Sequence, residues 1–430
     1  MSRLMKCVRL RMRSESFIDH CEERDFPRLR LWDFSDECGG AGMKRVKLSD
    51  AFDLQMGKTP SRKHLAYWRG GTEPWISIAD LSNCGKYIEQ TKENITSDAV
   101  QESNIKIVPK NTVVMSFKLS IGKVAITKRD MYTNEAIMAF HDRGRYEILT
   151  DYLYYFCKGN NWTSGTNKAV MGLTLNKKTL SEQTMLLPDM PEQEKIVKKL
   201  DALQESISNR QHVLMLLDEL VRSRFVEMFG DPVKNPYRWP KKLLTDLGDC
   251  KNGMNFHRDD EGYEIHCLGV GDFQNLSVIS DAEKLPLISL DTVPSQEYLL
   301  QDEDVVFVRS NGNKKLVGRC VAVYPKDVPT TFSGFCIRFR KNNKIEIQTK
   351  YLLQVLKSDG VKMQMEGRGA NIQNLNQKIL SQVEIPIPPL SLQTQFATFV
   401  HQVDATKSSV QSQLDSLTTL RAKLMQDFFG

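Results

Sequence analysis

Two long stretches of the chain repeat apolar side chains with the spacing of a coiled coil. From Ile196 to Met228 the ladder positions advance by alternating steps of four and three residues, and the same ladder returns 200 residues later. An apolar repeat of 3.5 residues sustained in this way is typical of helices that pair along a seam. Pro191 stands where the first helical turn would begin. The pattern therefore predicts two long helices, over 191–230 and 391–430.

We expect the two helices to pair with each other, although each stripe could instead be buried within its own domain. Pairing is favoured because charged ladder positions fall opposite apolar ones, with Arg210 facing Val410 and Lys407 facing Ile207. The pattern leaves the direction of pairing open. The apolar residues expected in the seam are Ile196, Leu200, Leu203, Ile207, Leu214, Leu217, Val221, Phe396, Val400, Val403, Val410, Leu414, Leu417 and Leu424.

The helices belong to a larger internal duplication. LNKKTLS at 175–181 falls on LNQKILS at 375–381, and from there to the ends of the helices 14 of 56 positions are identical without a gap. Upstream, VKLSDAFDLQMG at 46–57 parallels KLLTDLGDCKNG at 242–253 with a drifting offset, as expected where only loops differ in length. The chain therefore consists of a globule and a helix, each present twice.

Each globule is predicted to be mixed α/β (α+β). Short β-rich runs bounded by turn residues, such as 112–117 and 305–308, alternate with helical stretches such as 151–157 and 351–357. Residues 1–42 have no counterpart in the repeat, and we expect a disordered extension or a misassigned start codon there. The remaining predicted domains are a first globule at 43–190, a helix at 191–230, a second globule at 231–390 and a helix at 391–430.

Composition indicates a soluble protein. Hydrophobic residues make up 40% of the chain and charged residues 26%, the mean hydropathy is −0.39, and no apolar run is long enough to span a membrane. The basic start never runs into the apolar core of a secretion signal, and the nine cysteines form no CxxC pair. We therefore expect a cytoplasmic protein with reduced thiols.

The net charge of +6 is concentrated in the first globule, where 43–190 carries 21 basic and 15 acidic side chains. This balance permits a polyanionic partner without requiring one. The second globule is nearly neutral.

Motifs for catalysis are incomplete. Gly57-Lys58-Thr59 resembles the end of a phosphate loop, but Phe52 stands where the first glycine is needed. Asn235-Pro236-Tyr237 lacks the second proline of the amino-methyltransferase motif, and the carboxylates at 189–194 are replaced in the second copy. We therefore expect neither catalytic residues nor a metal site in this chain.

Together these features resemble the specificity subunit of type I restriction-modification enzymes. The resemblance is carried by the LNxKxLS segments, by the proline-containing strands MLLPDMPEQEKIV at 185–197 and EIPIPPLSLQTQF at 384–396, and by helices that end in MFGD or FFG. It covers 43–430, nearly the whole chain.

The resemblance implies a non-catalytic DNA-recognition subunit. Each globule would be a target-recognition domain for one half of a bipartite asymmetric double-stranded DNA target, and the two helices would pair antiparallel as a spacer. Two methyltransferase subunits would dock on the chain and methylate adenine with S-adenosylmethionine. Restriction/translocase subunits, which use ATP and Mg, would join them. No cofactor is expected on the chain itself.

Candidate DNA contacts are loop residues with forked or amide side chains, because Arg and Lys read guanine edges whereas Asn and Gln read adenine. In the first globule they are Lys58, Arg62, Lys63, Arg69, Lys118, Lys123, Asn167 and Lys168. In the second globule they are Arg258, Arg309, Asn311, Asn313, Lys314, Lys315, Arg319, Arg368, Asn371 and Gln373. The run 309–315 is the strongest candidate, and the alternative there is an ordinary hairpin tip.

Two other classes of protein remain as alternatives. A coiled-coil scaffold without DNA readout would show no salt-dependent affinity for DNA. A self-sufficient restriction or methyltransferase enzyme would bind S-adenosylmethionine or cleave DNA without partners.

Overall fold

The computed structural model describes residues 44–118, 120–162, 175–257, 259–273, 276–342, 344–366 and 374–430. The extension expected at 1–42 lies outside these residues. The described chain forms two compact units, the first reaching Val197 and including Phe428–Gly430, and the second comprising Lys198–Asp427.

The first unit is built around a five-stranded sheet. Its strands lie in the order β2 (Phe52–Met56), β9 (Ile137–Asp142), β6 (Val113–Ser116), β7 (Val124–Thr127) and β4 (Tyr87–Ile88). All neighbours are antiparallel except β4 and β7. Strands β6 and β7 are buried along their whole length, which explains their continuous runs of apolar and small residues. Helix α5 (Thr150–Gly159) packs on β6 and β7.

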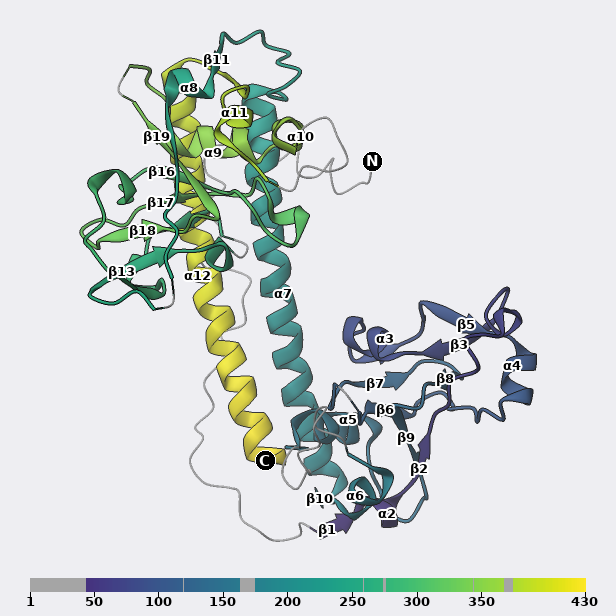
Figure 1. Ribbon diagram of the computed structural model, residues 1–430. Coiled ribbons are helices and arrows are strands. Elements are labelled where there is room, and N and C mark those ends of the chain that lie inside the picture. The colour runs from purple at the N-terminus through teal and green to yellow at the C-terminus, as the bar shows by residue number, and fades with distance from the viewer. Residues whose placement is uncertain are drawn as a thin grey trace, which may run out of the picture. The chain divides into compact units, whose positions relative to one another are not determined.

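Smaller elements complete the first unit (Figure 1). A three-stranded sheet has the order β5 (Glu93–Ile95), β3 (Glu73–Ile76) and β8 (Tyr132–Thr133), and β1 (Lys44–Lys47) pairs with β10 (Thr184–Leu187). The short helices are α2 (Leu48–Ala51), the 3-10 turn η1 (Leu65–Tyr67), α3 (Ile78–Asn83), α4 (Ser97–Glu102) and α6 (Lys177–Glu182).

The second unit repeats this architecture strand for strand, which confirms the internal duplication. Its five-stranded sheet has the order β12 (Gly248–Asn252), β19 (Cys336–Lys341), β16 (Asp304–Val308), β17 (Cys320–Val323) and β14 (Val278–Ile279). The three-stranded sheet has the order β15 (Leu287–Leu290), β13 (Tyr263–Leu268) and β18 (Thr330–Phe332), and β11 (Lys241–Leu243) pairs with β20 (Glu384–Pro386). The helices of this globule are α8 (Leu244–Leu247), α9 (Thr349–Lys357), α10 (Asp359–Glu366) and α11 (Gln377–Leu380), with 3-10 turns η2 (Val270–Phe273), η3 (Ala282–Lys284), η4 (Gln296–Tyr298) and η5 (Lys314–Leu316).

The two long helices are α7 (Met190–Phe229) and α12 (Leu390–Phe429), each one residue earlier than expected at both ends. Within the second unit they run antiparallel, side by side in Figure 1. Arg421 Nη1 donates to Gln204 Oε1 at 2.8 Å, and Arg210 Nε donates to Gln413 Oε1 at 3.1 Å. From Gln204 to Arg210 the residue number on α7 rises, whereas that of the bonded residue on α12 falls from 421 to 413. The two helices are therefore antiparallel.

The antiparallel direction corrects one sequence-based expectation. Arg210 does not face Val410 but bonds Gln413, and Lys407 does not face Ile207 but forms an ion pair with Asp218 at 2.5 Å. The expectation assumed that residues 200 positions apart face each other across the seam. Such residues face each other only if the two helices are parallel.

The expected seam residues are buried or half-buried. The buried ones are Ile196, Leu200, Leu203, Ile207, Val221, Phe396, Val400, Val403, Leu414 and Leu424. The half-buried ones are Leu214, Leu217, Val410 and Leu417.

Near the C-terminal end of α7 the buried positions differ from the predicted ones, which were Arg224 and Met228. The structure buries Phe225 and Phe229 instead, because this end of α7 enters the core of the second globule as well as the seam. The centre of the Phe229 ring lies 4.7 Å from the centre of the Tyr351 ring on α9. Steps of four residues there follow the 3.6-residue period of a helix that packs against a globule.

A buried glutamine links each long helix to its globule. Gln193 Oε1 accepts from Leu149 N at 2.9 Å, and Gln393 Oε1 accepts from Gln348 N at 3.0 Å. The Nε2 groups donate to the carbonyl oxygens of Pro188 and Pro388 at 3.0 and 2.8 Å. Both glutamines are fully buried, so their identity in the two copies reflects a shared structural role.

Candidate nucleic-acid interface

In the first unit, three candidate residues, Lys58, Lys118 and Lys123, lie near one end of the five-stranded sheet, where β2 and β6 end and β7 and β9 begin. We call this end, and its counterpart in the second unit, the loop edge. Phe117 N donates to Ala136 O at 2.9 Å, and Leu175 N donates to Phe117 O at 3.1 Å. Three chain segments therefore meet at this loop edge.

The loop edge of the second unit is built by the same backbone hydrogen bonds. Arg309 N donates to Phe335 O and Leu375 N donates to Arg309 O, both at 2.8 Å. The register of β16 with β19 and β17 matches that of β6 with β9 and β7. Arg309 therefore occupies the place of Phe117, and Phe335 that of Ala136.

Glycines shape both hairpins at the loop edges. Gly122 and Gly318 have φ values of 83° and 80°, which side chains other than glycine rarely adopt. Each donates back to the last residue of the preceding strand, Gly122 to Ser116 O at 3.0 Å and Gly318 to Val308 O at 2.9 Å. The Gly-Lys and Gly-Arg steps in the sequence mark these turns.

A second pair of glycines brings the segment after β2 or β12 against the neighbouring loop. A Cβ on Gly57 would lie 2.2 Å from Thr133 O, and one on Gly253 would lie 2.1 Å from Ser333 O. Any side chain would push the two segments apart. This contact places Lys58 beside the first loop edge.

Family comparison agrees with this duplicated design. Residues 41–214 and 236–419 match the model of the type I restriction modification DNA specificity domain. The chain belongs to this specificity-domain family. Each matched segment contains one globule and much of the helix that follows it. The domain that the family model describes therefore corresponds to one copy of the internal repeat.

Two curated specificity subunits are similar to this chain. The MjaIX subunit of Methanocaldococcus jannaschii is 31% identical over 228 residues, covering 49% of this chain and 52% of that protein. The StySPI subunit of Salmonella potsdam is 21% identical over 373 residues, covering 78% and 79%. The chain thus matches about half the length of the first relative and most of the second.

A solved structure shares the fold. It concerns complex assembly and conformational transition of the type I R-M system, and the match covers 90% of this chain and 97% of that chain. The TM-score is 0.56 and the sequence identity is 16%. At this identity the likeness concerns the fold alone.

In the first unit of this specificity-domain chain, the loop edge gathers part of the predicted set. Lys58 and Lys123 are exposed there, and Lys118 Nζ lies 5.2 Å from the centre of the Phe117 ring. Lys63 and Arg69 are exposed on either side of η1. Asn167 and Lys168 lie outside the described residues.

Arg62 already has partners within the first unit. Its guanidinium donates twice to the Glu93 carboxylate, at 2.6 and 2.9 Å, and stacks 3.6 Å from the centre of the Trp68 ring. The hydrogen bonds from Arg62 hold the pKa of Glu93 below its usual range. This arrangement favours a structural role for Arg62 over the DNA contact expected from sequence.

In the second unit, one hairpin loop between β16 and β17 holds most of the predicted set. Asn311 Oδ1 accepts from Asn313 N at 2.7 Å, and Asn313 Oδ1 accepts from Lys315 N at 3.1 Å. The side-chain oxygens of Asn311 and Asn313 thus bond the backbone of the loop. Their side-chain NH₂ groups take no part in these two bonds and could donate to a ligand. The side chain of Lys314 and the residues Arg258, Arg368, Asn371 and Gln373 lie outside the described set.

Arg309 and Arg319 lie at the two ends of this hairpin loop. Both are half-buried. Arg309 Nη1 donates to Gly334 O at 3.2 Å, and Arg319 follows the turn at Gly318. Five described side chains of the predicted set, at 309, 311, 313, 315 and 319, therefore share one hairpin loop.

Two loop-edge residues were missed by sequence reasoning. Glu135 is exposed and accepts a hydrogen bond from the Thr59 hydroxyl, and a carboxylate can accept from the cytosine amino group. Phe335 is 61% exposed. For Phe335 the available signal in the sequence was the difference between the two copies, because the repeat sets a phenylalanine against Ala136.

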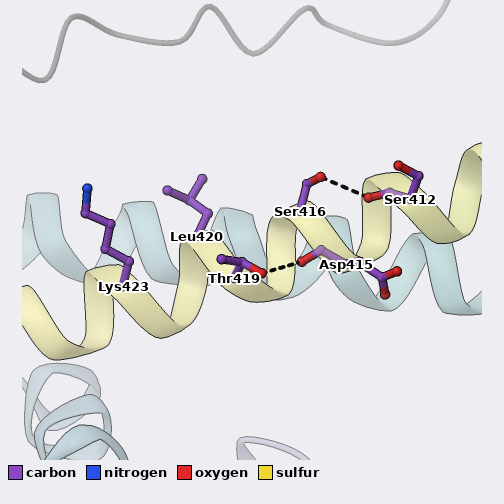
Figure 2. Close-up of a pocket in the computed structure, with 6 residues that line it drawn as sticks. All are labelled: Ser412, Asp415, Ser416, Thr419, Leu420 and Lys423. Carbon is purple, nitrogen blue, oxygen red and sulfur yellow. Dashed lines mark hydrogen bonds between the residues drawn. The ribbon is translucent and has the colours of Figure 1, made fainter. Parts of the chain in front are cut away.

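The hollow on the exposed face of α12 is a different kind of feature (Figure 2). The described residues that line it belong to that helix: Ser412, Asp415, Ser416, Thr419, Leu420 and Lys423. The hydroxyls of Ser416 and Thr419 donate to carbonyl oxygens one turn earlier, both at 2.9 Å. Because the described residues of this lining all come from one helix, they do not form the converging set of groups that is typical of a small-molecule site.

The buried cysteines have the chemistry of structural thiols. Burial raises the pKa of Cys320 to about 11 and that of Cys267 to about 12. Both thiols therefore stay protonated at neutral pH and are poor nucleophiles. Within the described ranges, no helix is long and apolar enough to cross a membrane.

Proposed function

We propose that this chain is the DNA sequence-specificity subunit of a type I restriction-modification complex and recognises a bipartite, asymmetric target. The observation that carries the proposal is the pair of loop edges. They share the same backbone hydrogen bonds but present different side chains, Lys118 and Lys123 in one and Arg309 to Arg319 in the other. Equivalent frames with unlike side chains suit two unlike half-sites.

The helices supply the spacing in this proposal. Each of α7 and α12 has 40 residues, or about 60 Å at 1.5 Å per residue. Their polar cross-links, such as Arg210 with Gln413, stiffen the pair. We infer that the length of this pair sets the number of base pairs between the half-sites.

The chemistry belongs to partners in this proposal. Methyltransferase subunits carrying S-adenosylmethionine would modify adenine, and restriction/translocase subunits using ATP and Mg would cleave. The chain itself would direct these subunits to the target without catalysing either reaction. Membership of the specificity-domain family supports this division of labour.

Methylome sequencing tests the proposal directly. Cells carrying this chain with its methyltransferase partner are compared with cells that lack only this chain. We expect a split, asymmetric adenine-methylated motif that appears only with the chain. The same methylation in both strains would overturn the proposal and favour a self-sufficient methyltransferase.

Purified protein separates the remaining rivals. Affinity of the full chain for the identified duplex should fall steeply with salt, because phosphate contacts release counterions. A chain that shows no affinity for DNA at any salt concentration would instead be a scaffold.

A further inference from the structure

Phe335 is an exposed aromatic ring on a fixed piece of backbone at the second loop edge. Phe335 is 61% exposed, whereas Phe332 and Cys336 on the same stretch of chain are fully buried. Phe335 O accepts from Arg309 N at 2.8 Å and from Ser310 N at 3.3 Å. These two hydrogen bonds fix the backbone at Phe335, and its side chain lies on the solvent-exposed side of that backbone.

The exposed ring is not required by the fold. The equivalent residue in the first unit, Ala136, is only 7% exposed and makes the same backbone hydrogen bond, from Phe117 N to its carbonyl. An alanine thus satisfies this position structurally. A single exposed apolar side chain is common on protein surfaces, so what distinguishes Phe335 is its position against the donor-rich loop that begins at Arg309.

The surroundings of the ring indicate which ligand fits. Phe335 is flanked by the loop with Arg309, Asn311, Asn313 and Lys315, and Arg309 Nη1 bonds to the adjacent Gly334 O. Cationic and amide donors suit phosphates and base edges, whereas an apolar ring beside them suits the faces of bases. DNA-binding proteins that unstack a base step combine these two features.

We propose that the Phe335 ring inserts against a base step of the second half-site and partly unstacks it. This inference rests on the proposed DNA-recognition function and assigns a specificity role within it. Pyrimidine–purine steps are the easiest to unstack, so the ring favours such a step at its position. At the equivalent position of the first unit the buried Ala136 supplies no such ring, so we expect no unstacking by this position at the first half-site.

The test uses the full chain assembled with its methyltransferase partner. Duplexes carry 2-aminopurine, a base whose fluorescence rises on unstacking, at successive positions through each half-site, with the methylated adenine positions left out. For the wild type we expect a rise at one step of the second half-site only. Phe335→Ala should abolish that rise and weaken binding to the target about tenfold, while Phe335→Trp should retain both.

Controls separate the wedge from general effects. Tyr237→Ala removes another exposed aromatic ring, 52% exposed, from the linker after α7, and should leave the fluorescence and the affinity unchanged. Phe335→Ala should melt at the wild-type temperature, because the lost ring is exposed.

Three results would overturn the inference. Wild type and Phe335→Ala could give the same fluorescence and affinity, or the variant could lose affinity equally for random DNA. In both cases the DNA-recognition function would stand without the wedge. If the wild type itself did not prefer its target over random DNA, the proposed function would fail as well.

Discussion

At the residue scale, one backbone frame supports different chemistry in the two units. Phe117 and Arg309 make equivalent main-chain hydrogen bonds, yet Phe117 is buried and Arg309 is half-exposed with its guanidinium on Gly334 O. The frame is held by backbone atoms and by glycines at 122 and 318. Side chains at the loop edge can therefore change without altering the fold.

Arg309→Ala should weaken binding at the second half-site alone. A guanidinium that reads a base contributes about 1–3 kcal/mol, and its loss relaxes specificity at one position. Competition binding with duplexes altered in one half-site at a time measures this. Lys284→Ala, which removes an exposed cation paired with Asp281, is the control. Equal loss on random DNA would instead make Arg309 a phosphate contact.

Gln393→Leu should destabilise the second unit by about 1–3 kcal/mol, because it leaves Gln348 N and Pro388 O buried without their partner. Thermal melting of the full chain measures the loss. Gln402→Leu, at an exposed site on the same helix, should leave the melting temperature unchanged. Equal shifts for both variants would show that the buried hydrogen bonds contribute little.

At the element scale, α7 has two kinds of packing along its length. Between the pairs Gln204–Arg421 and Arg210–Gln413 it lies against α12. Toward its C-terminal end, Phe225 and Phe229 join the core of the second globule with Tyr351. The seam and the core are thus separate regions of one helix, and they should respond separately to mutation.

Ile207→Glu combined with Leu414→Glu should open the seam and abolish specific binding while the globules stay folded. Both residues are buried in the paired stretch, 3% and 9% exposed, and a carboxylate buried there without a partner would lose its hydration at a large cost in free energy. Hydrogen exchange should speed up in α7 and α12 but not in β16 and β19. Met215→Glu, at a site 68% exposed, is the control. Equal loss of protection in the strands would mean that the seam is part of the globular core.

At the scale of the whole molecule, duplication gives two recognition units from one chain. The five-, three- and two-stranded sheets recur in the same order. In the first unit, the ring centres of Phe429 on α12 and Tyr152 lie 5.5 Å apart. In the second unit, those of Phe229 on α7 and Tyr351 lie 4.7 Å apart. Each copy thus contains a globule with the end of a long helix packed on it.

Inserting one heptad into each helix within the paired stretch should lengthen the spacer without changing either half-site. Seven residues add about 10.5 Å, or about three base pairs at 3.4 Å each. Methylome sequencing of the variant reads the new motif directly. A three-residue insertion in α7 alone, which breaks the seam register, should yield no motif. An unchanged spacer with the heptad insertions would contradict the role of the helices in spacing.

Much of the fold could be predicted from the sequence, and the candidate site only in part. The repeat predicted the duplicated α/β globules and the long helices, because positions such as Gln193 and Gln393 or Gly122 and Gly318 make the same contacts in both copies. Side-chain type alone nominated Arg62, yet Glu93 and Trp68 hold its guanidinium. The partners of a surface cation come from distant segments, and local pattern does not contain them.

The sequence by itself determined which residues are apolar at helical and strand spacing, and hence the elements, their duplication and the family. The apolar pattern left the direction of the helix pair open, because a 3.5-residue ladder has the same spacing in both directions; the family resemblance implied an antiparallel pair, and the tertiary structure confirms it. It also decided that Phe335 lies in water, since its place beside buried Phe332 and Cys336 is typical of a core residue. The spacing of apolar residues predicts which face of a helix or strand is buried. Only the three-dimensional fold determines which other element packs against that face.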